Sequence, residues 1–379
     1  MKVLICQICR ALSGSEKYII ELLPLLKERG IEPVFLAVSL KKDDDNYQEI
    51  IKPIEDQGVK VYHIATQYPL SFTLIKQIHK IIQKEGYPLV NPHLIHADFW
   101  MALVKTFFYQ KLKIVSLKHG FGDAFTQEFG HDSAKKKYNL YYFVARYAET
   151  KINHSIAVSN GVANLHIAQG ISKKDEISVV YTGLNTQAFN KREGEHYRVS
   201  KQQLVVIGRL IPLKNHKVLF EAMPKVMEAF PDCQLLVLGD GPERQNLEKL
   251  ITDLSLENNV VLLGHRTDAL AYVEASDAMI IPSKSEGFPL VVLEAFGLKT
   301  PVIGFDVPSI NEMIVDGESG YLIKPFNADL LADKIIELLQ NKEQAAGFAE
   351  AAYDRLQSHF DRKVMGDKIV EQFLRIGHL

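Results

Sequence analysis

Short apolar runs alternate with helical patterns along most of this chain, and this alternation constrains its fold more than any other feature. Apolar runs of about four to eight residues bounded by turn formers predict buried strands, and the amphipathic stretches between them predict covering helices. Strand and helix repeats of this kind build parallel sheets with helices on both faces. We therefore expect an α/β protein.

The expected strands form two series. In the first half they lie at Lys2–Ile8, Pro33–Ser39, Val59–Ile64, His93–Ala97, Lys113–Leu117, Ser155–Ser159 and Ile177–Tyr181. The second series begins at Leu204 and continues near Gln234, Asn259, Asp277, Pro301 and Gly320, with only helical patterns from about Asn327. The polar, glycine-containing stretch from Thr182 to Gln202 indicates a linker. We expect two doubly wound, Rossmann-like domains facing across a cleft, residues 1–185 and residues 186–358.

Composition excludes several classes of protein. A chain of 379 residues with 47% apolar and 24% charged side chains is typical of a soluble globular protein. Its apolar runs are too short for a membrane span or a signal peptide, so a cytoplasmic location is expected. Its three cysteines cannot build a disulfide framework. Cys6 and Cys9 have the spacing of a redox or metal site, but a buried structural pair is favoured.

Positive charge is mildly enriched in the first half of the chain. Lys76, Lys80 and Lys84 follow one another at intervals of four residues beside an apolar stripe, and residues 135–137 are three lysines next to aromatic residues. A solvated helix face explains each cluster, yet together they would suit peripheral contact with anionic lipid at the inner face of a membrane. The charge density is too low to indicate nucleic-acid binding.

The segment 283–297, SKSEGFPLVVLEAFG, places two carboxylates around an expected helix start. Glu286 falls in the loop after a strand, and Glu294 falls inside the helix. Pro289 is expected at the first helical position, where the amides of Leu290 and Val291 would face the loop and bind an anion. Carboxylates accept hydrogen bonds from sugar hydroxyls, so the segment indicates a phosphorylated sugar. The alternative is an ordinary turn with two solvated glutamates.

Two cations follow another expected strand. The run from Val205 ends in Gly208 and Arg209, and Lys214 precedes Asn215, a plausible helix N-cap. A guanidinium and an ammonium together would neutralise a diphosphate without a metal. The turn at residues 239–243, GDGPE, also lies at the carboxyl end of a strand.

The first half offers two matching loops. Gly14 and Ser15 follow the first strand, where a glycine would let the backbone approach a ligand as a helix opens. His119 stands between a strand end and glycines, a position suited to a hydrogen bond with substrate. A structural histidine is an equally good explanation of that position.

Taken together, Gly208, Arg209, Lys214, the run Glu286–Pro289 and Glu294 resemble the donor-site motifs of glycosyltransferase family 4, retaining enzymes with the GT-B fold. The resemblance is strongest from Leu204 to Leu339 and looser in the first half. It implies a first domain on the acceptor side and a second that binds the donor. It also implies that the helical end of the chain, residues 359–379, packs back on the first domain.

The resemblance implies a role for each motif. Arg209 and Lys214 would bind the donor diphosphate, Glu294 the ribose hydroxyls, and Glu286 the transferred sugar. His119 would contact the sugar, the amides after Phe288 the sugar or phosphate, and the backbone near His265 and Arg266 the base. The expected donor-binding set is Gly14, Ser15, Gly208, Arg209, Lys214, His265, Arg266, Glu286, Gly287, Phe288, Leu290, Val291 and Glu294, with catalysis assigned to Glu286, His119, Arg209 and Lys214.

The implied activity is transfer of a hexose, with retention, from a UDP- or GDP-type nucleotide sugar to a hydroxyl acceptor. Neither a cofactor nor a divalent metal is expected. The acceptor would be a lipid-linked saccharide in the synthesis of polysaccharide, lipopolysaccharide or glycolipid. A dinucleotide-dependent oxidoreductase is disfavoured, because the loop after the first strand has one glycine where G-x-G-x-x-G is required. A sugar-nucleotide epimerase or a binding protein on the same fold remains an alternative.

Overall fold

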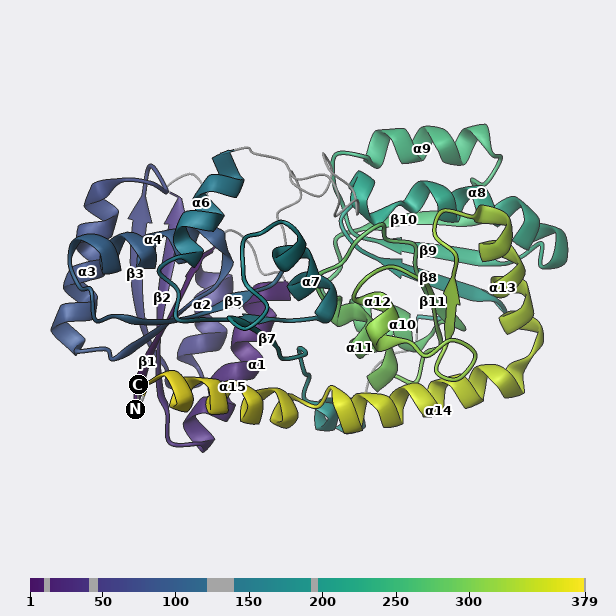
Figure 1. Cartoon of the computed structure of the whole chain (residues 1–379). Helices are drawn as coiled ribbons and strands as arrows, with labels where there is room; N and C mark the ends of the chain where they lie inside the picture. Colours follow the sequence, from purple (N-terminus) through teal and green to yellow (C-terminus); the bar gives the residue numbers. More distant parts are fainter. Residues whose placement is uncertain (10–13, 41–46, 121–139, 192–196, 378–379) are drawn as a thin grey trace. The chain divides into compact units, whose positions relative to one another are not determined.

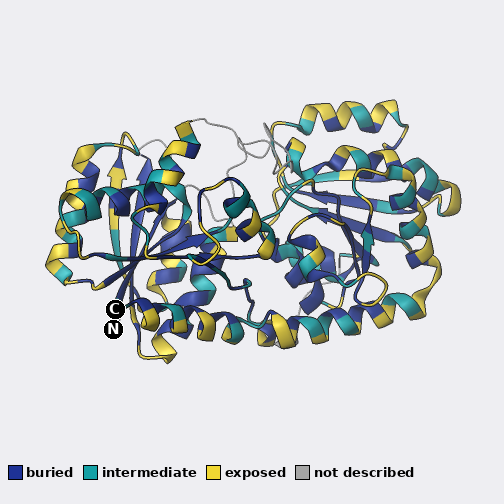
Figure 2. Cartoon of the chain, viewed as in Figure 1, coloured by how far each residue is buried: buried dark blue, intermediate teal, exposed yellow. Residues whose placement is uncertain are grey.

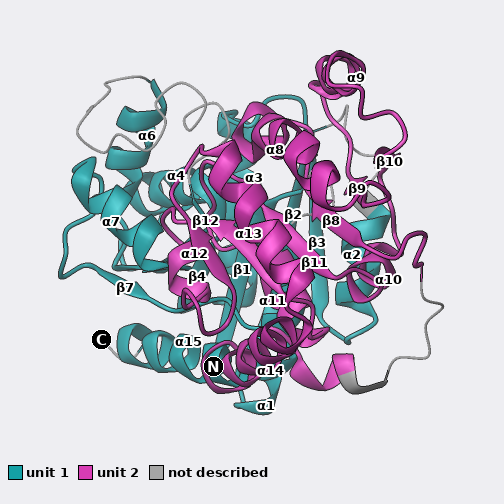
Figure 3. Cartoon of the chain, turned by 90° about the vertical axis from the view of Figure 1, so that its right-hand side faces the viewer, with its two compact units in different colours: residues 1–120, 132–183, 362–379 teal, residues 121–131, 184–361 magenta. Residues whose placement is uncertain are grey.

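The computed structural model describes residues 1–9, 14–40, 47–120, 140–191 and 197–377. By their internal contacts these residues divide into two units, coloured separately in Figure 3. The first unit holds the described residues up to 120, residues 140–183 and residues 362–377, and the second holds those from 184 to 361. Each unit is a parallel sheet with covering helices (Figure 1). This confirms the expected α/β class and its two Rossmann-like sheets.

The sheet of the first unit has seven strands in the order β3-β2-β1-β4-β5-β6-β7. Its strands are β1 (Lys2–Ile8), β2 (Glu32–Leu40), β3 (Lys60–Thr66), β4 (Leu89–Pro92), β5 (Lys113–Lys118), β6 (His154–Ala157) and β7 (Ile177–Val179). Its helices are α1 (Gly14–Glu28), α2 (Tyr47–Glu55), α3 (Phe72–Glu85), α4 (Leu94–Phe107), α6 (Leu140–Glu149), α7 (Asn160–Ala168) and α15 (Arg362–Gly377). The strands β1 and β2 are buried almost throughout, as Figure 2 shows, because helices cover both faces of a parallel sheet.

One expected strand was wrong. The run His93–Ala97 was expected to be a strand, but His93 is the N-cap residue of α4 and the next four residues are its first turn. The strand is the shorter run before it, β4, whose four residues are all buried. The strand ends at Pro92, and Leu94, with φ 68°, turns the chain into the helix. A short apolar run cannot be assigned to strand or helix from periodicity alone.

The second unit has six parallel strands in the order β10-β9-β8-β11-β12-β13. They are β8 (Gln203–Ile207), β9 (Gln234–Leu238), β10 (Val260–Gly264), β11 (Ala278–Ile281), β12 (Val302–Phe305) and β13 (Tyr321–Ile323). Its helices are α8 (His216–Ala229), α9 (Arg244–Asp253), α10 (Ala269–Glu274), α11 (Leu290–Gly297), α12 (Ile310–Met313), α13 (Ala328–Gln340) and α14 (Lys342–His359), with 3-10 turns η2 (Thr186–Lys191) and η3 (Pro212–Lys214).

Each sheet has one point at which the strand order reverses. In the first unit β1 lies between β2 and β4, and in the second β8 lies between β9 and β11. The chain builds one half of each sheet outward from this point and then returns to build the other half. In open α/β sheets, ligands bind outside the carboxyl ends of the strands at such a switch point. The loops that follow β8 and β11 are therefore the first place to look for a ligand site.

The last helix belongs to the first unit although it follows the whole of the second in sequence. It packs on α1, where Gly366 lies so close to Leu25 that a Cβ on the glycine would come within 2.8 Å of it. Ion pairs border the contact: Arg362 Nη1 lies 3.2 Å from Glu21 Oε2, and Arg29 pairs with Asp367.

Candidate functional site

The loops after β8 and β11 are joined by an ion pair. Lys214 Nζ lies 2.6 Å from Glu286 Oε1, and both side chains are largely buried. Two further hydrogen bonds fix the same loops: Lys284 N donates to Leu213 O at 2.8 Å, and Asn215 Nδ2 donates to Pro282 O at 3.1 Å. The structure therefore brings together Lys214 and Glu286, which the sequence assigned to phosphate and sugar respectively.

Asn215 occupies the expected N-cap position of α8 but does not cap it. Its backbone has φ 55°, in the left-handed region that asparagine tolerates better than most residues, and its side chain makes no capping hydrogen bond. The amide instead binds the end of the neighbouring strand through Pro282. Asn215 is thus a scaffold residue of the site that sequence reasoning assigned only to the helix.

Glycines let the loop after β9 support the loop after β8. Gly239 has φ 136°, and a Cβ there would lie 2.0 Å from the carbonyl oxygen of Gly208. A Cβ on Gly241 would lie 2.5 Å from Leu210 O. Leu210 N donates to Asp240 O at 3.0 Å, which joins the two loops backbone to backbone. The GDG turn therefore holds the segment that carries Arg209, whose own side chain is exposed.

The helix α11 begins one residue later than expected. Pro289 was expected at its first position but is the N-cap residue, with φ −73° and ψ 108°. Leu290 and Val291 are then the first two helical residues, whose N–H groups have no partner within the helix. Glu294 lies in the middle of α11 and is 8% exposed. The loop before the helix is held by Ser309, whose hydroxyl donates to Glu286 O at 3.1 Å.

Ser309 is a second residue of this site that the sequence reasoning missed. It is fully buried, lies in the loop after β12 and has φ 75°. A non-glycine residue in that region is uncommon and is held there by its surroundings. The signal in the sequence was weak, because Ser309 is one serine within a long stretch that resembles the glycosyltransferase family.

His265 and Arg266 lie in the loop after β10. The bond from Gly239 N to Gly264 O, 2.7 Å long, ties this loop to the one after β9. Arg266 is already engaged, since its Nε and Nη2 donate to the two oxygens of Asp268 at 2.8 and 2.6 Å. Its guanidinium also lies over the ring of Tyr272, 5.5 Å from the centroid. A contact from Arg266 to a ligand would therefore come from its backbone.

In the first unit, Gly14 and Ser15 open α1, while Ser13, the residue before them, lies outside the described residues. The Ser15 hydroxyl accepts from Gln7 Nε2 at 3.0 Å and donates to Glu16 Oε2 at 3.1 Å. Gln7 and Glu16 are both buried and also bind each other. The end of β1 and the start of α1 are thus joined by side chains.

His119 follows β5 and is part of a chain of polar side chains. Its Nε2 lies 3.0 Å from His93 Nδ1, and His93 Nε2 lies 2.8 Å from Asn91 Oδ1. The ring of Tyr18 from α1 packs edge-on against His119, 5.1 Å between centroids. His119 keeps part of its surface exposed, but desolvation of its ring lowers its pKa to about 3. It is therefore neutral at pH 7.

Lys118, the neighbour of His119, belongs to a buried ionic cluster. Its Nζ lies 2.7 Å from Asp98 Oδ2 and 2.9 Å from Glu149 Oε2. Burial opposes the charge of Lys118, but the two carboxylates outweigh that effect and raise its pKa above the usual value. The cluster fixes α4 and α6 to β5 and so positions the strand end that carries His119.

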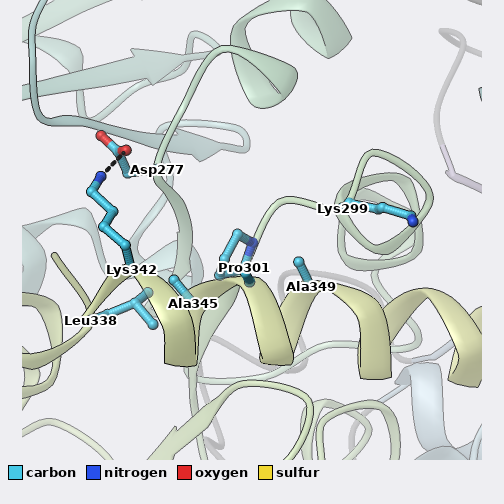
Figure 4. A pocket seen from close by; sticks show the side chains of 8 residues that line it. Asp277, Lys299, Pro301, Leu338, Lys342, Ala345 and Ala349 are labelled. Atoms are coloured by element: carbon cyan, nitrogen blue, oxygen red, sulfur yellow. Dashed lines mark hydrogen bonds and ion pairs between the residues drawn. The ribbon is translucent and has the colours of Figure 1, made fainter.

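A hollow formed by described residues of the second unit lies away from this site. It has a volume of about 150 Å³ and lies under α14 at the amino ends of β11 and β12 (Figure 4). Asp277 on its wall is bound by Lys342, 2.9 Å away, and by Arg198, 2.7 Å away. We assign it no ligand.

Within the described part of the chain, no group of three or more His, Cys, Asp or Glu side chains is placed to hold a metal ion. Among the same residues, no helix is both long and apolar enough to cross a membrane. Cys6 and Cys9 are free and buried, and burial raises the pKa of both thiols, so they match the structural alternative.

Two Rossmann-like sheets, each with a switch point, are the architecture of GT-B proteins, and family models agree. The model described as "Glycosyl transferases group 1" matches residues 188–355, and the one described as "Glycosyltransferase Family 4" matches residues 12–188. Together they span nearly the whole chain. The chain belongs to the family 4 glycosyltransferases with the GT-B fold.

Individual relatives agree with this assignment. The N-acetyl-alpha-D-glucosaminyl L-malate synthase of Bacillus anthracis is 27% identical over 359 residues, which cover 92% of this chain and 89% of that protein. The capsular polysaccharide biosynthesis glycosyltransferase CapM of Staphylococcus aureus is 22% identical over 248 residues, covering 62% of this chain and 65% of CapM.

Solved structures share the fold across the whole chain. HepE of Anabaena, in complex with UDP and glucose, has a TM-score of 0.79 at 20% identity and covers 99% of this chain and 100% of its own. The pneumococcal O-GlcNAc transferase GtfA, in complex with UDP and GlcNAc, has a TM-score of 0.74 at 15% identity, with 100% and 99% covered.

Proposed function

We propose that this glycosyltransferase moves a sugar from a UDP- or GDP-type nucleotide sugar to a hydroxyl acceptor, with retention of configuration. The observation that carries the proposal is the ion pair between Lys214 and Glu286, which holds a cation and a carboxylate together beside the helix start at Leu290. A diphosphate needs the cation and the helix amides, and a sugar hydroxyl needs the carboxylate. The UDP complexes of HepE and GtfA support a nucleotide-sugar donor.

The chemistry follows from where charge develops. As the sugar departs, negative charge grows on the diphosphate, and preorganised donors stabilise that charge most effectively. Arg209, Lys214 and the first amides of α11 are assigned to this task, without a divalent metal. An ammonium has three donors, so Lys214 would keep its bond to Glu286 while it binds a phosphate oxygen.

Glu286 is assigned to positioning the sugar, and its hydrogen bond from Lys214 supports that assignment because it fixes the direction of the carboxylate. Glu294 is assigned to the ribose hydroxyls, and the backbone at His265 and Arg266 to the base. His119 is assigned to the transferred sugar. These roles remain proposals.

The acceptor is proposed to be a lipid-linked saccharide used for cell-surface polysaccharide, lipopolysaccharide or glycolipid, as the named function of CapM suggests.

We also propose that α3 contacts anionic lipid. Lys76, Lys80 and Lys84 are all exposed on the outer face of this helix. Phe72 at its start is 54% exposed and packs 6.4 Å from Phe107, which is 62% exposed. The second lysine cluster that the sequence assigned to lipid contact, residues 135–137, lies outside the described residues.

The test is release of free nucleotide from a panel of UDP-glucose, UDP-GlcNAc, UDP-galactose and GDP-mannose, with and without hydroxyl acceptors. A transferase releases nucleotide much faster when an acceptor is present. An epimerase converts the sugar without that release, and a binding protein does neither. The panel is first ranked by thermal shift, because a ligand that binds only the folded state raises its stability.

A further inference from the structure

We propose that Asn91 and His93 are positioning residues that fix His119 as a hydrogen-bond acceptor, so that the substrate group it meets must be a donor such as a sugar hydroxyl. The contact of His119 with sugar rests on the proposed function. The direction of donation along the hydrogen bonds from His119 through His93 to Asn91 does not rest on it, because that direction follows from contacts inside the first unit.

The first step is Asn91, whose orientation is set by the backbone. Asn91 Nδ2 lies 2.6 Å from the carbonyl oxygen of Val115, which can only accept. The nitrogen of the amide must therefore point to Val115, and Oδ1 must point to His93. Asn91 is 1% exposed, so water does not compete for either atom.

The second step is His93. Because Asn91 Oδ1 accepts, His93 Nε2 must carry a hydrogen and donate to it across 2.8 Å. His93 is fully buried, and burial lowers its pKa well below the usual value, so the ring is neutral and carries one hydrogen. Its Nδ1 therefore has a lone pair and acts as an acceptor.

The third step is His119. Its Nε2 must donate to His93 Nδ1 across 3.0 Å. Because this ring is also neutral, the hydrogen on Nε2 leaves a lone pair on Nδ1. No described residue donates to His119 Nδ1, and the residue keeps some solvent exposure. The remaining nitrogen thus offers an acceptor to a ligand, which favours hydroxyl or ammonium groups and disfavours carboxylates.

The tautomer is tested directly by ¹⁵N NMR of histidine-labelled full-length protein without ligand. We expect His119 to carry its hydrogen on Nε2 and not on Nδ1. In His93→Leu, which removes the acceptor, the two tautomers should mix. In His93→Asn, whose side-chain oxygen replaces Nδ1, the original tautomer should persist. His154→Asn, at a buried histidine bound only to Ser178 in the described structure, is the control. A hydrogen on His119 Nδ1 in the unmodified protein would overturn the proposal.

The substrate side is tested with deoxyfluoro analogues of whichever nucleotide sugar of the panel gives the largest thermal shift. Fluorine cannot donate a hydrogen bond, so one analogue should bind about tenfold more weakly to the unmodified protein. In His119→Leu, which lacks the acceptor nitrogen, the same analogue should bind almost as tightly as the parent nucleotide sugar. Equal losses in both proteins for every analogue would show that His119 meets no donor. If no nucleotide sugar binds at all, the proposed function fails while the NMR result still decides the polarity.

Discussion

Lys214 Nζ lies 2.6 Å from Glu286 Oε1, across 72 positions of sequence. The pair joins the loops on the two sides of the switch point between β8 and β11. Neither residue is isolated before a ligand arrives: the ammonium already has a carboxylate partner, and the carboxylate is already held in one direction. Preorganisation of this kind is what lets charged groups stabilise a transition state without rearrangement.

Removing the cation should impair turnover severely. We expect Lys214→Ala to lower kcat about a hundredfold or more, and Arg209→Ala to do the same, because each removes a stabiliser of the leaving diphosphate. Lys217→Ala, at an exposed lysine one turn further along, should leave kcat unchanged. In the double variant Lys214→Ala/Glu286→Gln the activation free energy should rise by less than the sum of the two single-variant increases, since the two side chains interact. Strict additivity in steady-state kinetics would contradict coupling between them.

Chelation should leave activity intact. If Arg209, Lys214 and the amides of α11 together neutralise the diphosphate, EDTA should change the rate by less than about twofold, far below the hundredfold effect of losing a cation. The measurement is the transfer rate before and after dialysis against EDTA. Loss of activity that Mg²⁺ or Mn²⁺ restores would show that these cations are not sufficient.

Glu294→Ala should weaken nucleotide binding and spare the fold. A carboxylate that accepts hydrogen bonds from ribose hydroxyls contributes roughly 1 to 3 kcal/mol. Titration calorimetry with UDP and GDP should show that loss for the nucleotide that binds better. Glu294→Gln, which keeps an acceptor in a buried position, separates a ligand effect from a packing effect. Unchanged affinity in the alanine variant would remove the ribose assignment.

The protein should lose stability as the pH falls below about 6.5, the usual pKa of an unfolded histidine. Burial lowers the pKa of His154 and His216 to about 4 and that of His166 to about 3. The unfolded chain therefore binds more protons in this range, and each such histidine lowers the unfolding free energy by up to about 1.4 kcal/mol per pH unit. Urea unfolding from pH 7.5 to 5.5 should show this slope grow from near zero to about 1.2 kcal/mol per pH unit for each of these histidines.

The matched comparison uses one buried and one exposed histidine. His166→Leu should flatten the slope at pH 5.5 by about 1.2 kcal/mol per pH unit, because it removes one of the groups that must stay neutral in the folded state. His63→Asn, at an exposed position, should leave it unchanged. A slope that His166→Leu does not alter would mean that the acid sensitivity arises elsewhere.

Binding to anionic vesicles should depend on α3. Each lysine near a charged bilayer contributes about 1 kcal/mol, so changing Lys76, Lys80 and Lys84 to Gln should weaken binding to phosphatidylglycerol vesicles by about a hundredfold. Phe72→Ser should weaken it through the apolar contact. Changing Lys201, Lys249 and Lys324 to Gln removes the same charge from the second unit and is the control. Equal loss of vesicle binding in both triple variants would show that α3 attracts anionic lipid no more than any other lysine-bearing surface does.

Much of the fold could be predicted because most of its strands, such as β1, β2 and β11, are buried on both faces and so appear as apolar runs. The exception, β4, has only four residues, and two of them, Asn91 and Pro92, are atypical of strands. The loops of the site were also predictable, since each follows a strand at its carboxyl end. Periodicity predicts which residues follow a strand, but it contains no information on which loops then touch.

Contacts between distant segments could not be predicted for that reason. Lys214 and Glu286 were each assigned to a loop, but their ion pair depends on β8 and β11 becoming neighbours. His119 was a candidate, whereas Asn91 and His93 were missed because their importance lies in a chain of hydrogen bonds through the sheet. Ser309 and the amide of Asn215 were missed for the same reason.

The contact between Gly239 and the carbonyl of Gly208 limits how this enzyme can be redesigned. A library that varies residue 239 or 241 would place side-chain atoms inside the neighbouring loop, so nearly every member would misplace Arg209 before any substrate is tested. Asp240 between them has an exposed side chain whose Oδ1 accepts from Gly241 N at 2.7 Å, so it is open to residues such as Asn that keep this acceptor. A search for new donor specificity should therefore keep the two glycines constant and vary Asp240 and the loop at His265, where a change of side chain leaves the diphosphate machinery untouched.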